Sequence, residues 1–227
     1  MNHFVSINVA VILLALFDNG KAQSTVSPCV DLVIAFDVSC SLADGERETA
    51  LTLVQQLVNN LGVPTNQIAL FTYDKYIYHK MYLNDFKMKI LYLSALGNVN
   101  TQAKKCRTKT WKALRTARLN YFTVENGDRP NVKNVLLLFT DGISYPKYKY
   151  SKTVLEVQRL KSSLSGSQSS DSPTDIYVIG LKNKYGHNGE KEWETIATDP
   201  FYVYPLTDVG MIVQNLKSDF EQYTCEL

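Results

Sequence analysis

Side chains with oxygen atoms follow directly after an apolar run near the start of the chain. Residues 32–36 read Leu-Val-Ile-Ala-Phe, a continuous apolar segment typical of a fully buried strand. Asp37, Ser39 and Ser41 come next, in one short loop. Ligand sites of open α/β sheets lie beyond the carboxyl ends of strands, and three oxygen ligands in one loop suit a hard divalent cation. This stretch therefore predicts an α/β sheet with a cation site at its edge.

Two later segments also place oxygen ligands at the boundary of an expected element. Residues 108–114, Thr-Lys-Thr-Trp-Lys-Ala-Leu, begin with a threonine where a helix is expected to start. Residues 135–139 form a second apolar run, which ends in Thr140, Asp141 and Gly142. Parallel strands end at the same edge of a sheet, so we expect these segments to meet the first loop.

The three segments, in this order, resemble the von Willebrand factor type A (vWA) domain and its metal-ion-dependent adhesion site. The resemblance spans roughly residues 31–220, and one departure from the family pattern is Cys40, inside the first loop. Asp37, Ser39 and Ser41 match the DxSxS loop of the family. Thr108 matches its lone threonine, and Asp141 matches the aspartate of its TDG strand end. These five candidate metal ligands are Asp37, Ser39, Ser41, Thr108 and Asp141.

The resemblance implies a magnesium site that binds a protein ligand. Two carboxylates and three hydroxyls, without imidazole or a necessary thiolate, favour Mg²⁺, with Mn²⁺ able to substitute and Ca²⁺ less suitable. In this family the ion takes a Glu or Asp carboxylate from the partner as a further ligand. An alternative interpretation is that these residues only cap helices and make turns; Thr108 would then be the N-cap of its helix.

Strand and helix patterns alternate along the chain, which predicts an α/β fold. We expect a doubly wound, mostly parallel central sheet with one short antiparallel edge strand and helices on both faces, the Rossmann-like vWA fold. Asp44 is expected to cap the first helix rather than border a second cation site. The expected strands are 32–36, 67–73, 76–83, 135–141, 176–181 and 201–206. The expected helices are 44–61, 85–96, 108–121, 151–164, 190–197 and 208–223, with a Ser-rich loop over 162–174.

Composition excludes several function classes. The chain has 227 residues, is 45% hydrophobic and carries a net charge of +2, as expected of one globular domain. Lys and Arg are spread along the sequence and no Gly-rich phosphate loop follows a strand, so no nucleic-acid partner is indicated. GxSxG and HExxH motifs are absent, and His79 and His187 lie more than a hundred residues apart. We therefore expect no enzymatic activity.

The amino-terminal residues have the pattern of a secretory signal peptide. Residues 5–17 form an apolar stretch too short to span a bilayer, and the small-residue sequence Gly-Lys-Ala at 20–22 follows. A buried amino-terminal helix is the alternative. The expected organisation is a signal peptide over 1–22, a flank over 23–30, the vWA domain over 31–223 and a second flank over 224–227. Because no second apolar span follows, we expect a secreted, extracellular protein without a membrane span.

The four cysteines fit an oxidising compartment. Three pairings are possible. We favour Cys29 with Cys225, because they flank the domain and the ends of a domain often lie close together. Cys40 and Cys106 then remain, and folding around one ion would bring both near the metal ligands and within bridging range. The competing interpretation, a structural zinc site, lacks the usual CxxC spacing.

The predicted function is an extracellular adhesion module that binds a protein ligand, with collagen or another matrix protein as candidates. Tyr145, Tyr148 and Tyr150 follow Asp141 closely, so we expect them on the ligand-binding rim; an ordinary exposed loop is the alternative. A second hypothesis is a structural protein of a fibrous or mineralised matrix, in which metal-dependent binding is secondary. Metal dependence of partner binding separates the two hypotheses.

Overall fold

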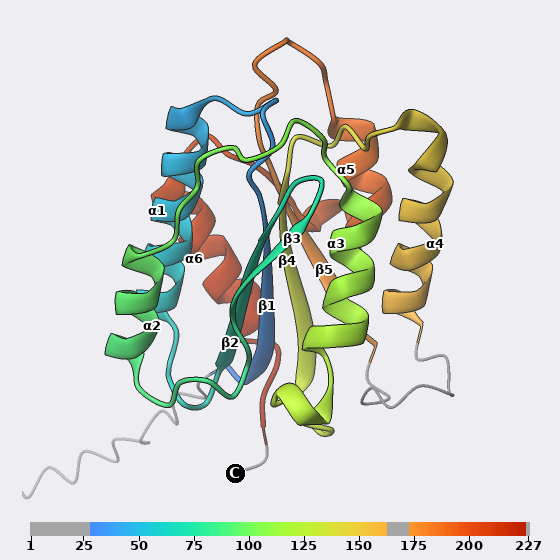
Figure 1. Ribbon diagram of the computed structural model, residues 1–227. Coiled ribbons are helices and arrows are strands. Elements are labelled where there is room, and N and C mark those ends of the chain that lie inside the picture. Colours follow the sequence, from blue (N-terminus) through green and yellow to red (C-terminus); the bar gives the residue numbers. More distant parts are fainter. Residues whose placement is uncertain (1–27, 163–172, 226–227) are drawn as a thin grey trace, which may run out of the picture.

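The computed structural model describes residues 28–162 and 173–225 (Figure 1). The expected signal peptide and most of the expected Ser-rich loop lie outside the described residues. Within the described part of the chain, no helix is both long and apolar enough to cross a membrane.

One central sheet contains all the described strands. Its six strands lie in the order β3-β2-β1-β4-β5-β6, and every neighbouring pair is parallel except β2 with β3. This confirms the predicted fold class, including the antiparallel edge strand. The strands are β1 (Val30–Asp37), β2 (Gln67–Tyr73), β3 (Ile77–Met81), β4 (Lys133–Thr140), β5 (Asp175–Gly180) and β6 (Val203–Pro205).

Helices cover both faces of the sheet (Figure 1). One apolar core lies between the sheet and α1, α2 and α6, and a second lies between the sheet and α3, α4 and α5. Strands enclosed in this way are apolar on both faces, which is why β1 is buried along its whole length. The helices are α1 (Asp44–Asn60), α2 (Lys89–Gly97), α3 (Thr110–Thr116), α4 (Tyr150–Lys161), α5 (Glu190–Ile196) and α6 (Val209–Phe220).

The strand register brings the candidate loops together. Strand β1 lies between β2 and β4, with Asp37 opposite Tyr73 and Phe36 opposite Phe139. The chain therefore leaves β1 toward one side of the sheet and later returns on its other side. Such a reversal of strand order opens a crevice at the carboxyl ends of the strands, where ligands of α/β proteins bind.

The predicted first residues of several helices and strands are wrong. Helix α2 begins at Lys89 and not at residue 85, because the Asp85 carboxylate instead accepts a hydrogen bond from the backbone N–H of Tyr82 in a turn. Asp44 is the first residue of α1, and its side chain does not cap the helix. Strand β6 is shorter than expected because residues 200–202 form a 3₁₀ turn.

The predicted helix over 108–121 also differs from the structure. Helix α3 starts at Thr110, and the remainder, Ala117–Tyr121, is a π-helical turn. A π turn alters the direction of the side chains that follow it. Tyr121 is nevertheless buried, packed against Phe71 of β2 with ring centroids 4.8 Å apart.

Two disulfides join the four cysteines in the pairing that the sequence favoured. Cys29 and Cys225 are linked with Cα atoms 5.5 Å apart, and Cys40 and Cys106 with Cα atoms 4.6 Å apart. The first bridge ties the start of β1 to the segment after α6, where the Cys29 N–H also donates to the carbonyl of Tyr223 at 2.9 Å. The described ends of the domain therefore lie side by side, far from the candidate site in the sheet.

Candidate metal centre

The first loop turns sharply at the end of β1. Asp37 is fully buried, and its Oδ1 atom accepts a hydrogen bond of 2.8 Å from the backbone N–H of Ser39. Arg47 of α1 donates through Nη1 to the carbonyl oxygens of Ser39 and Leu42, at 3.2 and 2.6 Å. Those contacts fix the backbone of the loop while the Arg47 guanidinium does not pair with the Asp37 carboxylate.

Three hydroxyl groups from two distant segments form one hydrogen-bonded group. Thr108 Oγ1 donates to Ser39 Oγ at 2.8 Å, and Ser39 Oγ lies 2.9 Å from Ser41 Oγ. Thr108 and Ser39 are 1–4% exposed, although 69 residues separate them in sequence. Helix α3 begins two residues after Thr108 with no side-chain cap, so the capping alternative does not account for this threonine.

Two carboxylates, of Asp37 and Asp141, belong to the same site, and neither takes part in a salt bridge among the described residues. Among the described residues, Asp37 Oδ2 is buried and has no hydrogen-bond partner. Burial, followed by the negative charge of Asp141, raises the pKa of Asp37 well above its ordinary value. Asp141 is fully buried too, and accepts hydrogen bonds from the Ile143 N–H at 3.1 Å and from Asn183 Nδ2 at 2.8 Å.

This donor set has the chemistry of a site for a hard divalent cation. A buried carboxylate oxygen without a partner is costly, and a bound cation compensates such a charge. No group of three or more His, Cys, Asp or Glu side chains in the described ranges is arranged to hold a metal, so hydroxyl oxygens would have to complete the coordination. Oxygen donors of this kind suit Mg²⁺ or Mn²⁺ better than soft metals.

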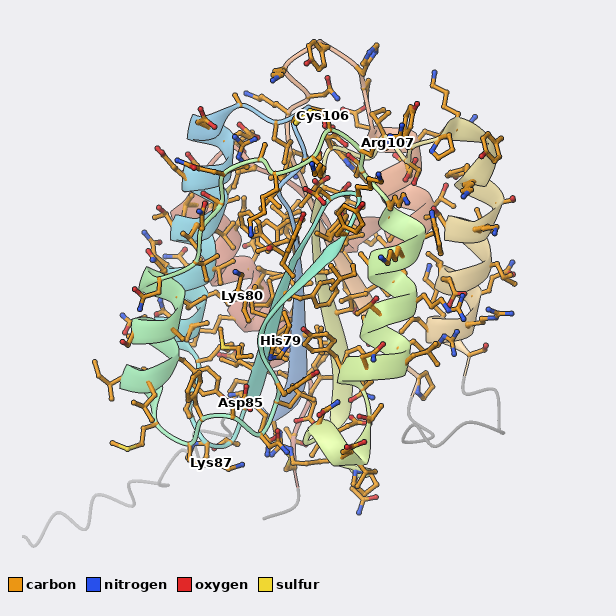
Figure 2. All side chains as sticks on the ribbon, in the orientation of Figure 1. His79, Lys80, Asp85, Lys87, Cys106 and Arg107 are labelled. Carbon is orange, nitrogen blue, oxygen red and sulfur yellow. A yellow bond between two sulfur atoms is a disulfide. The ribbon has the colours of Figure 1, made fainter. Side chains whose placement is uncertain are left out.

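The segment that carries Thr108 is fastened on both sides. Asp74, buried at the end of β2, accepts a hydrogen bond from the Lys105 N–H through Oδ2 at 2.7 Å, and its carbonyl accepts one from the Lys109 N–H at 3.2 Å. The disulfide between Cys40 and Cys106 joins the same segment to the first loop. Figure 2 shows Cys106 and Arg107 at the end of the molecule where these loops converge.

A third loop, over 182–189, completes the surroundings and was not recognised from the sequence. Its Asn183 donates to Asp141, and the Lys184 N–H donates to the Ser41 carbonyl at 2.8 Å. Its position in the sequence could have indicated this loop, because it follows β5 and so lies at the same edge of the sheet. Glu192 of α5 is a second missed residue, which accepts hydrogen bonds from the Ser144 backbone N–H and hydroxyl.

A cavity of about 270 Å³ opens over two of the hydroxyls. Of the three tyrosines expected on the rim, Tyr145 lines this cavity, and its ring lies 5.4 Å from the Arg107 guanidinium. Tyr148 is exposed but does not line it, and Tyr150 donates to Thr195 Oγ1 of α5 at 3.0 Å. The lining residues are Cys40, Ser41, Cys106, Arg107, Thr108, Ile143, Tyr145, Asn183, Tyr185 and His187.

Fold and loops together define an α/β domain with a candidate cation site at the switch point of its sheet. The family model described as von Willebrand factor type A domain matches residues 31–218. The chain therefore belongs to the vWA family.

The curated relatives include integrin and collagen chains. Integrin alpha-1 of Gallus gallus is 25% identical over 218 residues, which cover 91% of this chain and 75% of that protein. Collagen alpha-5(VI) chain of Mus musculus is 26% identical over 207 residues, covering 87% of this chain but only 7% of the collagen chain. The similarity to the collagen thus concerns a small part of a much longer protein.

Solved structures share the fold at lower identity. Proximal thread matrix protein 1 (PTMP1) from the mussel byssus superposes with a TM-score of 0.72 at 20% identity, over 86% of this chain and 48% of that one. Another PTMP1 structure, with a TM-score of 0.70, has a zinc-occupied MIDAS motif. This chain spans about half the length of the PTMP1 chain.

Proposed function

We propose that this protein is a secreted extracellular binding module that holds Mg²⁺ at Asp37, Ser39, Ser41, Thr108 and Asp141 and binds a protein ligand there. The observation that carries this proposal is the buried, unpartnered Oδ2 atom of Asp37 beside three mutually hydrogen-bonded hydroxyls. Burying a carboxylate oxygen without a partner is costly, and a bound cation would offset that cost.

Each residue has a distinct part in the proposed site. Ser39, Ser41 and Thr108 supply neutral oxygen ligands, while Asp37 and Asp141 supply negative charge. A divalent ion held mainly by neutral oxygens stays electrophilic and attracts a carboxylate of the partner. Asn183 holds the Asp141 carboxylate in place, and Arg107 at the mouth of the cavity favours an anionic group.

The preferred ion follows from the donor atoms. Five oxygen ligands with no imidazole among them favour Mg²⁺, with Mn²⁺ as a substitute and Ca²⁺ less suitable because it needs more oxygens. The zinc-occupied motif of PTMP1 shows that this type of site in a relative admits another divalent ion. We therefore expect Zn²⁺ to bind in competition with Mg²⁺ at sufficient concentration.

The extracellular assignment has three supports. Both disulfides of the described residues are typical of an oxidising compartment, the relatives include collagen and integrin chains, and the first 22 residues have the pattern of a signal peptide. A matrix protein that offers a Glu or Asp side chain, such as collagen, is the proposed partner.

A structural role in a matrix is the second candidate. It is favoured by the shared fold with PTMP1, whose name describes a matrix protein of the mussel byssus. In that case the domain would organise an assembly, and its contacts would persist without a metal ion.

The test is metal-dependent capture. Mature protein is immobilised, exposed to an extracellular matrix extract with Mg²⁺ or with EDTA, and Mn²⁺ affinity is measured by calorimetry. We expect capture to require the metal and Asp141→Ala to abolish both signals, with Glu48→Ala, an exposed site on α1, as the control. Capture that is equal in EDTA favours the structural role, and undiminished Mn²⁺ affinity of Asp141→Ala contradicts the site.

A further inference from the structure

A second surface, beside the metal edge, gathers positive charge around aromatic rings. Two ammonium groups share the Tyr76 ring, with Lys75 Nζ at 5.2 Å and Lys112 Nζ at 5.7 Å from its centroid. Two more share the Trp111 ring, with Lys149 Nζ at 5.6 Å and Lys152 Nζ at 5.5 Å. We call this surface the lysine cluster; its members are Lys75, Arg107, Lys109, Lys112, Lys149 and Lys152.

The charges of the lysine cluster are not neutralised by ion pairs. Every salt bridge among the described residues uses a cation elsewhere, on Arg47, Arg118, Arg129, Lys133 or Arg159. Lys109 lies within electrostatic range of Lys75, Lys112, Lys149 and Arg107. Because the whole chain carries only +2, six unpaired cations on one surface make the charge distribution strongly uneven.

An aromatic groove of about 350 Å³ continues from the cluster along β3 and α3. Its rings are close together, with His79 and Tyr82 at 4.1 Å and Tyr82 and Tyr121 at 5.2 Å between centroids. Figure 2 shows His79 partway along β3, beside α3. The lining residues are Tyr76, Ile77, His79, Tyr82, Lys112, Thr116, Asn120 and Tyr121, with no carboxylate among them.

The groove and the cluster meet at Tyr76 and Lys112, so they form one continuous surface. Lys112 belongs to both, and Tyr76 of the groove lies beneath the ammonium groups of Lys75 and Lys112. At the far end of the groove, Asp85 Oδ2 accepts a hydrogen bond from the Tyr82 N–H. A ligand that follows this surface thus meets cations at the metal end and rings with hydroxyl, imidazole and amide groups farther along.

We propose that this surface binds a linear sulfated polysaccharide, independently of the metal site. A pyranose ring has an apolar face that packs on an aromatic ring and hydroxyl groups that hydrogen-bond to side chains such as Asn120 and Thr116. Its sulfate groups pair with the ammonium groups of the cluster. An acidic polypeptide offers charge without the flat apolar face, and the disulfides indicate an oxidising compartment rather than one rich in nucleic acid.

The test measures binding of a fluorescent heparin octasaccharide by anisotropy, in EDTA. The variant K75Q/K112Q removes both charges at Tyr76, and K87Q/K217Q removes two exposed charges away from this surface as the matched control. We expect the first variant to bind about tenfold or more weakly, and the control to bind like wild type. Wild-type affinity should also fall steeply as NaCl rises from about 50 to about 300 mM, because salt screens the attraction between sulfate and ammonium groups. Equal affinities of the two variants would overturn the proposal.

Further arms separate a polysaccharide from other polyanions. Tyr76→Leu keeps the lysines and should weaken octasaccharide binding about threefold by removing the ring. A desulfated octasaccharide should bind far more weakly than the sulfated one, since it lacks the charges. Poly-glutamate or single-stranded DNA of equal charge, binding as tightly as the sulfated octasaccharide, would contradict the assignment to a sugar. Asp141→Ala should bind the octasaccharide like wild type, which keeps this proposal distinct from the metal site.

Discussion

Ser39 lies at the centre of the three hydrogen-bonded hydroxyls in the candidate site, and replacing it tests the site directly. Its Oγ atom is hydrogen-bonded to both Thr108 Oγ1 and Ser41 Oγ, and the residue is 1% exposed. In Ser39→Ala the Thr108 hydroxyl loses its acceptor while it remains buried. A net hydrogen bond contributes about 1 kcal/mol and a stranded buried donor costs about 1–3 kcal/mol, so we expect the metal-free variant to lose about 2 kcal/mol.

Metal binding adds a second and larger effect on the stability of the folded state. A ligand present at a hundred times its Kd stabilises the folded state by about 2.7 kcal/mol, or roughly 5–10 °C in melting temperature for a domain of this size. Wild type should show this shift when Mn²⁺ replaces EDTA. Ser39→Ala should melt roughly 4–8 °C lower in EDTA and should gain little from Mn²⁺.

The assay is thermal unfolding by circular dichroism, with Ser94→Ala, an exposed serine of α2, as the matched control. A double-mutant cycle with Thr108→Val adds a check on the contact itself, because two residues in contact should show a coupling energy of about 1 kcal/mol. A Ser39→Ala variant that keeps the full wild-type shift in Mn²⁺ would refute the assignment of its hydroxyl to the metal centre.

Three further predictions concern the disulfides and one buried carboxylate. Cys225→Ser removes a disulfide of sequence separation 196, and the chain-entropy model predicts a loss of up to about 5 kcal/mol in the free energy of unfolding. The urea midpoint should fall accordingly, and an unchanged midpoint would contradict this prediction. Replacing both Cys40 and Cys106 with serine should weaken Mn²⁺ binding in calorimetry, since the tie between two ligand loops is lost, while lowering stability less than Cys225→Ser does. Burial raises the pKa of Asp31 to about 6 from 3.8, against the attraction of Arg129. The folded protein thus binds the proton more tightly, and this contribution to stability is complete below pH 3.8 and lost above pH 6. The free energy of unfolding of wild type relative to Asp31→Asn should therefore rise by about 2 kcal/mol as the pH falls from 7 to 4, and a difference that stays constant over this range would count against the raised pKa.

Local sequence patterns were sufficient for the architecture. Buried strands such as residues 32–36 and 135–139 are continuous apolar runs, and a parallel sheet with both faces covered requires such runs. The loop Asp37 to Ser41 lies in one short segment, so its candidate oxygen ligands could be recognised without any knowledge of packing. The fold class and the family could be predicted for this reason.

Element ends depended on contacts that the sequence does not display. Asp85 has the features of a helix start, yet its carboxylate accepts a backbone hydrogen bond from Tyr82 and helix α2 begins only at Lys89. Thr108 looked equally suited to cap a helix, and its hydroxyl instead donates to Ser39. In each case a tertiary or turn hydrogen bond competed with the local capping preference.

The surroundings of the site were decided only by the tertiary structure. Asn183 contacts Asp141 because β5 pairs with β4 in a register that ends both strands at one edge. Likewise Lys75, Lys112 and Lys149 are spread through the sequence as isolated charges, and only the packing of α3 against β3 and α4 assembles them. The sequence alone determined which segments become strands and which loop carries the candidate ligands, because those patterns are local. Contacts between distant segments depend on strand order and helix packing, and only the folded chain determines those.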